Sequence, residues 1–131
     1  MIVLDTHTLV WWVNGDDSLS RKAKTLINKE MKEGEIVISA ISAWEIAMLV
    51  TREKLVLSMD VETWLKTVAN IEALHFHPVD IEIAAKSVAL PGEFHKDPAD
   101  RMIVATARKF AAPLITKDEK IRAYPHVKTI W

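Results

Sequence analysis

The chain has 131 residues, a formal net charge of -1 and no cysteine, and half of its residues are apolar. This length suits one domain with one hydrophobic core, so we expect a single domain over residues 1–131. The balanced charge excludes a strongly basic nucleic-acid coat, and the missing cysteines exclude a disulfide scaffold, a thiolate metal site and a cysteine nucleophile. The N-terminus lacks a signal-peptide pattern, and no apolar run approaches the ~20 residues of a membrane span. We therefore expect a cytoplasmic protein that has no membrane segment.

Short apolar runs alternate with longer helical patterns along the chain. In chain order the patterns predict a strand at 2–4, a helix at 6–13, a helix at 20–32, a strand at 35–39, a helix at 42–50, a helix opening at 60, a strand at 74–79, a helix at 80–88, a helix opening at 97, a strand at 112–116 and a fifth strand at 127–131. Strands that alternate with helices imply a parallel sheet covered on both faces.

Several helix starts carry recognisable capping residues. Ser42-Ala43-Trp44-Glu45 has the S-x-x-E pattern of a capping box. Asp60 and Asp80 stand where N-caps are expected, and Asp97-Pro98-Ala99-Asp100 combines an N-cap, a proline at the first helical position and an acid in the first turn. Each of these acids therefore has a purely structural interpretation.

Four acids nevertheless fall where a parallel sheet would bring them together. Asp5 and Asp118 come just after predicted strands, and Glu45 and Asp100 lie in the first turns of predicted helices. Strand C-termini and the following helix N-termini share one edge of such a sheet, which is where ligands usually bind. Carboxylates that converge there repel each other unless protons or a cation neutralise them. Oxygen ligands favour Mg²⁺ or Mn²⁺, which suits phosphodiester hydrolysis.

The sequence resembles the PIN-domain ribonucleases, and in particular the VapC-type toxins of toxin–antitoxin pairs. Four motifs in order carry the resemblance, which covers essentially the whole chain: Leu4-Asp5-Thr6-His7-Thr8-Leu9 through Trp12, Ser39 to Ile46, His95-Lys96-Asp97-Pro98-Ala99-Asp100-Arg101 through Ala107, and Leu114-Ile115-Thr116-Lys117-Asp118. It implies a PIN-like three-layer α/β/α domain with a central parallel sheet of four to five strands in the order 3-2-1-4-5. That order would place the third strand at the edge and Asp80 away from the site.

The resemblance also implies roles for single residues. Asp5, Glu45 and Asp100 would be the principal ligands of Mg²⁺ or Mn²⁺. Asp97 would be an additional catalytic acid, and Asp118 stands where relatives carry Asn or Asp. The hydroxyls of Thr6 and Thr116 would position a water or a phosphate at the metal.

The resemblance implies partners as well, namely an RNA substrate, an antitoxin protein and a second copy of the chain in a homodimer. One departure from the family pattern follows the second motif, where Met48 and Glu53-Lys54-Leu55 replace a lysine and a Gly-Lys-Leu turn. This departure leaves the metal site intact and weakens any inference about substrate contacts.

Two other functions fit parts of the sequence. Asp5-Thr6-His7-Thr8-Leu9 is similar to the opening motif of haloacid-dehalogenase-like phosphatases, with Asp5 as nucleophile, although His7 replaces the second acid of that motif. A catalytically inactive binding module is the third alternative. Divalent-ion binding and a covalent aspartyl-phosphate would separate the three.

Tryptophan and histidine residues surround the predicted site. Of the five tryptophans, Trp11, Trp12, Trp44 and Trp64 fall in helical patterns, which favours core packing for most of them. Trp11 and Trp12 are adjacent, and neighbours on a helix point about 100° apart, so one of the two is a candidate for an interface. His7 and His95 flank the predicted acids.

Overall fold

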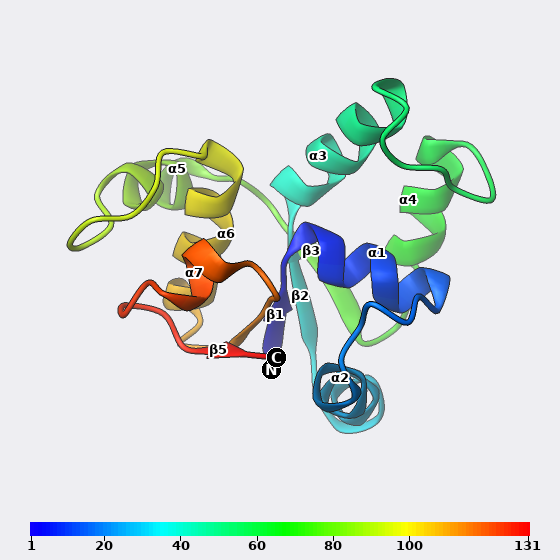
Figure 1. The fold of residues 1–131 in the computed structure, drawn as a ribbon, viewed down its shortest axis with the longest axis horizontal. Coiled ribbons are helices and arrows are strands. Elements are labelled where there is room, and N and C mark those ends of the chain that lie inside the picture. Colours follow the sequence, from blue (N-terminus) through cyan, green and yellow to red (C-terminus); the bar gives the residue numbers. More distant parts are fainter.

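The computed structural model describes all residues from Met1 to Trp131, and its centre is a five-stranded parallel sheet in the order β3-β2-β1-β4-β5 (Figure 1). The strands are β1 (Ile2–Leu4), β2 (Ile36–Ser39), β3 (Leu74–His77), β4 (Leu114–Ile115) and β5 (Thr129–Ile130). The helices are α1 (Thr6–Asn14), α2 (Arg21–Glu33), α3 (Ala40–Thr51), α4 (Val61–Ala69), α5 (Ile81–Val88), α6 (Pro98–Lys109) and α7 (Glu119–Arg122). All five predicted strands and their order are confirmed. None of the helices has both the length and the apolar character needed to span a membrane.

The two faces of the sheet build separate hydrophobic cores, because neighbouring side chains of a strand point to opposite faces. Ile2 and Leu4 of β1 pack in a cluster with residues of α1, α2 and α4, whereas Val3 packs in a cluster with residues of α5, α6 and α7. Figure 1 shows these two groups of helices on opposite sides of the sheet. The predicted α/β/α layering is therefore confirmed.

Most predicted helix starts are confirmed, with side-chain oxygens that accept backbone N–H groups. Asp60 caps α4 and Asp80 caps α5, while Asp97 caps α6 with Pro98 in the first turn. Helix α1 ends at Gly15, whose φ of 66° is a left-handed conformation that glycine adopts without steric cost.

The capping box predicted at Ser42 is wrong. Helix α3 begins at Ala40 and is capped by Ser39, whose side chain accepts the N–H of Ile41. Strand β2 thus runs into the helix without a loop, and Ser42 lies inside the first turn. Glu45 consequently lies in the second turn, one turn later than predicted, and closes no capping box.

Two further expectations need correction. Helix α7 was not predicted, because four residues are too short for a periodic pattern, and Asp118 is its N-cap. Among the tryptophans, Trp64 is buried and Trp12 packs against the same core, but Trp44 is 57% exposed on α3. Core packing is therefore the wrong interpretation for Trp44.

The register of the three central strands sets the place of the site. Leu4 of β1 pairs with Ile38 of β2 on one side and with Ile115 of β4 on the other. The next residue of β1 and of β4, Asp5 and Thr116, consequently stand side by side at the C-terminal edge of the sheet. Helices α1 and α3 start at this edge, as parallel topology requires.

Candidate active site

A cavity of about 540 Å³ lies at the C-terminal edge of the sheet. Its lining is formed by Asp5, Thr6, His7, Trp11, Glu45, Asp97, Asp100, Lys117, Asp118 and Glu119. Five of the predicted site residues are carboxylates, and all five line this one cavity. Asp80 is not among the lining residues, in agreement with the expectation that β3 would keep it away. Glu119 also lines the cavity and was not predicted, although it directly follows Asp118.

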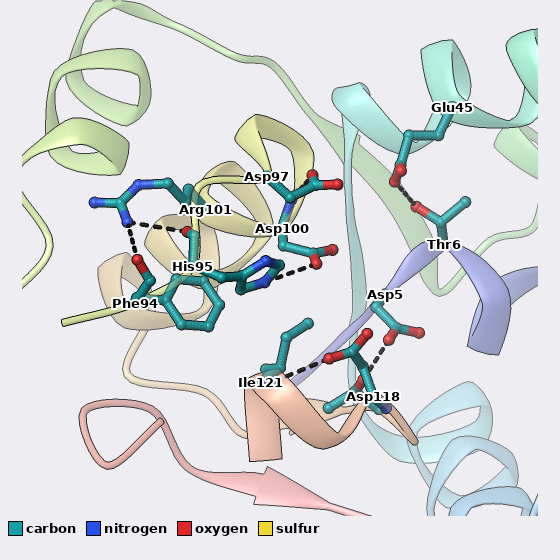
Figure 2. Close-up of polar contacts among 11 residues, drawn as sticks. Asp5, Thr6, Glu45, Phe94, His95, Asp97, Asp100, Arg101, Asp118 and Ile121 are labelled. Carbon is teal, nitrogen blue, oxygen red and sulfur yellow. Dashed lines mark hydrogen bonds and ion pairs between the residues drawn. The ribbon is translucent and has the colours of Figure 1, made fainter. Parts of the chain in front are cut away.

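Asp5 is the most deeply placed acid of the site. It caps α1, since its Oδ1 accepts the N–H of Thr8 at 3.0 Å, and its Oδ2 accepts the hydroxyl of Thr116 (Figure 2). Only 7% of the residue is exposed. Burial raises the pKa of Asp5, and the hydrogen bonds from Thr116 and Thr8 offset part of that rise. The hydrogen bonds thus hold the carboxylate in position, but they offset only part of the cost of burying its negative charge.

Glu45 faces Asp5 from α3 and is held by the next residue of the first motif. Thr6 donates its hydroxyl to Glu45 Oε1 at 2.5 Å, and Thr6 Oγ1 also lies 2.8 Å from Ser42 Oγ. Burial raises the pKa of Glu45, with a further contribution from the charge of Asp97. Ser42 and Glu45 therefore act together through Thr6, not as a capping pair.

Asp97 and Asp100 enter the cavity from the N-terminus of α6. Asp97 is exposed and caps the helix by accepting the N–H of Asp100 at 3.1 Å. Asp100 is half-buried, and its Oδ2 lies 3.0 Å from Nε2 of His95. Burial, followed by the charges of Asp97, Asp118, Glu45 and Asp5, raises the pKa of Asp100 to about 7. Burial is thus the largest cause, and repulsion from the four other acids adds to it.

Asp118 closes the cavity from the β4 side. Its carboxylate caps α7 through the N–H of Ile121 at 3.0 Å, and its own N–H donates to Thr116 Oγ1 at 3.0 Å. Because Thr116 also donates to Asp5, the hydroxyl links the first and fourth motifs directly. Thr6 and Thr116 thus both hold carboxylates, and Thr6 lines the cavity whereas Thr116 lies beneath it. Their role at a water or a phosphate stays a prediction.

Arg101 holds the loop that carries His95. Its guanidinium donates to the carbonyls of Phe94 and His95 through Nη1 (Figure 2). It also donates to the carbonyls of Ser87 and Val88 at the end of α5. Four backbone acceptors use the planar fork of arginine fully, and a lysine could not replace it. Arg101 is therefore a structural residue of the loop.

The residues fit a divalent cation in their chemistry. Hard oxygen donors from four separate segments line one cavity, and neither Lys117 nor any other lysine or arginine forms an ion pair with them. The side chains are turned toward protein partners as they stand, and no three of them are close enough together to share one ion. Glu45 is turned to Thr6, Asp5 to Thr116 and Asp100 to His95. Rotation of these side chains would be needed for them to share an ion.

Comparison with known proteins accounts for this arrangement of acids. The sequence matches the PIN-domain family over residues 2–127. It is also 37% identical over 134 residues to Ribonuclease VapC22 of Mycobacterium tuberculosis, an alignment that covers 99% of this chain and 98% of that protein. The chain belongs to the VapC-type PIN-domain ribonuclease family. The resemblance indicated by the four motifs is confirmed. The alternative of a haloacid-dehalogenase-like phosphatase is therefore set aside.

Solved structures support the same fold. A toxin–antitoxin complex from Klebsiella pneumoniae has a chain that superposes with a TM-score of 0.68 at 21% identity, covering 100% of this chain and 97% of that one. VapBC2 from Rickettsia felis, solved with a DNA fragment from its promoter, has a TM-score of 0.70 at 18% identity, covering 99% and 98% of the two chains. The PIN fold is therefore retained at low sequence identity.

Proposed function

We propose that this VapC-type protein is a metal-dependent endoribonuclease that acts in the cytoplasm as the toxin of a toxin–antitoxin pair. The observation that carries the proposal is the convergence of Asp5, Glu45, Asp97, Asp100 and Asp118 on one cavity. These five acids come from four sequence motifs and meet where a parallel sheet binds its ligands. The 37% identity to a VapC ribonuclease over nearly the whole of both chains supports the same activity.

Asp5, Glu45 and Asp100 would hold Mg²⁺ or Mn²⁺. When bound, such a cation activates water for attack on a phosphodiester and stabilises the charge on the leaving oxygen. In the structure as it stands, Thr116 and Thr6 hold Asp5 and Glu45 at the cavity through hydrogen bonds. This support is the outer-shell hydrogen bonding that metal-binding carboxylates usually receive.

Asp97 and Asp118 lie at the exposed rim of the cavity and are less suited to bind the cation directly. Both already cap helices, and both are exposed. Their charges contribute to the raised pKa of Asp100 and hence to the demand for a cation. We assign them to the electrostatics of the site and to the orientation of water or phosphate.

The same acidity suggests how a partner protein would inhibit the site. An antitoxin can neutralise the cavity by inserting an arginine or lysine among Asp5, Glu45 and Asp100, since a desolvated carboxylate strongly favours a charge-assisted hydrogen bond. A homodimer is the other expected assembly. Ile81 and Val88 of α5 support it, because they are 90% and 79% exposed and lie two turns apart on one helix face.

The first test measures cleavage of single-stranded RNA by the purified protein with Mg²⁺ or Mn²⁺. Cleavage should stop with EDTA, and Asp5→Asn should lower it by at least about 100-fold while the protein stays folded. Asp60→Asn is the matched control, since Asp60 also caps a helix but lies outside the cavity. Full activity in EDTA or in Asp5→Asn would refute metal-dependent catalysis and would leave a metal-independent nuclease. A well-folded protein that neither cleaves RNA nor binds divalent ions would favour an inactive binding module.

A further inference from the structure

Trp11 is the one hydrophobic residue among the ten that line the acidic cavity. It lies on α1 one turn after His7, and the two rings are 5.7 Å apart between centroids. Trp131 at the C-terminus contacts Trp11 edge-on at 5.9 Å, and Lys117 Nζ lies 5.9 Å from the centre of the indole ring. His7 on the same helix and two residues from distant parts of the sequence, Lys117 and Trp131, therefore surround this indole beside the cavity.

Its neighbour Trp12 has a different environment. Trp12 packs against the core cluster formed with α2 and α4 and does not line the cavity. Neighbouring residues of a helix point about 100° apart, so α1 directs one tryptophan to the core and the other to the site. Packing explains Trp12 but does not explain an indole beside five carboxylates.

The surroundings of Trp11 favour one class of ligand. A protein segment that docks on an apolar surface needs several adjacent hydrophobic residues, and the cavity offers only this indole among charged and polar groups. An unpaired nucleobase needs a single aromatic face, with its phosphates held by cations nearby. Lys117 is exposed and a lysine side chain has four rotatable bonds, so its ammonium can leave the indole and contact a flanking phosphate.

We infer that Trp11 is a stacking platform for one unpaired base of the RNA, next to the phosphate that the acidic site receives. This inference rests on the proposed ribonuclease function and adds to it a subsite for a base. His7 and Trp131 hold the ring in place, and Lys117 provides the positive charge beside it. The subsite predicts that the enzyme requires a single-stranded position at the cut, because a base inside a duplex cannot stack on the indole.

Binding of two oligonucleotides tests the subsite separately from catalysis. One probe is a dodecamer of adenylate, and the other is the same sugar-phosphate chain without bases. The affinity for each probe is measured once with Ca²⁺ and once with EDTA. Wild-type protein should bind the adenylate dodecamer about 5- to 150-fold more tightly, and its tryptophan fluorescence should change on binding. Trp11→Leu should remove both the preference and the fluorescence change, whereas Trp11→Phe should retain part of the preference. Trp12→Phe is the matched control and should keep both.

The outcomes distinguish the two proposals. Equal affinity for both dodecamers in wild-type protein, or no binding of either, overturns the base platform, whatever the protein does to RNA. A preference that survives Trp11→Leu overturns it as well, and loss of antitoxin affinity in that variant would then assign Trp11 to a protein interface. A preference that disappears in Trp11→Leu supports the platform even if the wild-type protein cleaves no RNA, which would count against the ribonuclease function alone.

Discussion

Aspartates cap helices both inside and outside the acidic cavity. The local hydrogen-bond geometry is the same in the two regions, but the pKa of the carboxyl shifts in opposite directions. Asp60 and Asp80 accept the N–H groups of Thr63 and Ile83 at 3.1 and 2.8 Å. The hydrogen bonds from the hydroxyl and then the N–H of Thr63 lower the pKa of Asp60, and the bond from the N–H of Ile83 lowers the pKa of Asp80. Asp5 accepts the N–H of Thr8 at 3.0 Å in the same way, yet burial raises its pKa.

The difference comes from the place of each cap in the sheet. Asp60 and Asp80 lie outside the cavity, beside solvent or beside Lys109, which is 3.9 Å from Asp80. Asp5 follows the central strand β1 and shares its cavity with Glu45 and Asp100, and no lysine or arginine forms an ion pair with it. A capping aspartate is therefore a structural residue or a site residue according to its neighbours in three dimensions.

The largest expected effect is on catalysis. Glu45→Gln and Asp100→Asn should each lower RNA cleavage by at least about 100-fold, because an amide brings no charge and ligates a hard cation poorly. Asp80→Asn should stay within about twofold of wild type, since asparagine caps a helix as well as aspartate does. Cleavage rates should be compared with thermal melts of the same samples. If the Glu45→Gln and Asp100→Asn proteins are stable and fully active, these two acids have only a structural role.

Metal should stabilise the folded protein through the cavity acids alone. At 100 times its dissociation constant, Mg²⁺ should increase the free energy of unfolding by about 2.7 kcal/mol, provided that it binds only the native state. Asp100→Asn should lose most of this increase, and Asp80→Asn should keep it. Thermal melts over a Mg²⁺ titration measure the effect. A melting temperature that does not respond to millimolar Mg²⁺ would contradict metal binding by the cavity acids.

The pH dependence of stability should differ in sign between the two regions. In metal-free protein, Asp100 has a folded-state pKa of about 7 against an ordinary value of 3.8, so the native state binds the extra proton between these values. Stability should therefore fall as the pH rises from about 4 to about 7. Asp100→Asn should gain on the order of 1–4 kcal/mol relative to wild type from about pH 5 to about pH 8 in EDTA.

The control for this experiment is Asp80→Asn. The pKa of Asp80 is lowered, so its contribution is present above the ordinary value and is lost only in more acidic solution. The difference in stability between Asp80→Asn and wild type should thus be constant over the same pH range. A constant difference for Asp100→Asn as well would argue against repulsion among the cavity acids.

The smallest effect on cleavage among the cavity acids is expected at Asp97, which is both a helix cap and a cavity residue. It caps α6 and also lies at the rim of the cavity. Asp97→Asn should change the free energy of unfolding by less than about 0.5 kcal/mol, and cleavage should fall by less than about tenfold. Paired melts and cleavage assays against Asp100→Asn measure the contrast. A loss of cleavage at Asp97→Asn equal to that at Asp100→Asn would make Asp97 a principal ligand.

The sequence by itself determined the alternation of strands and helices, most helix starts and the identity of the acids. These features depend on local physics, namely apolar periodicity and the capping preferences of aspartate, serine and glycine. The start at Asp97-Pro98 is set by residues within one turn of it and was predicted correctly. The four motifs were sufficient to identify the family.

Only the tertiary structure decided which of these residues act together. The start of α3 at Ala40 was missed because β2 runs straight into the helix, and Ser42 forms its bond with Thr6, 36 residues away in the sequence. The link from Thr116 to Asp5 spans 111 residues. Such contacts depend on the register of β1 with β4, and the pKa of each acid depends on burial and on charges brought in by other elements. The direction of Trp11 toward the cavity and of Trp12 toward the core likewise follows from how α1 packs on the sheet.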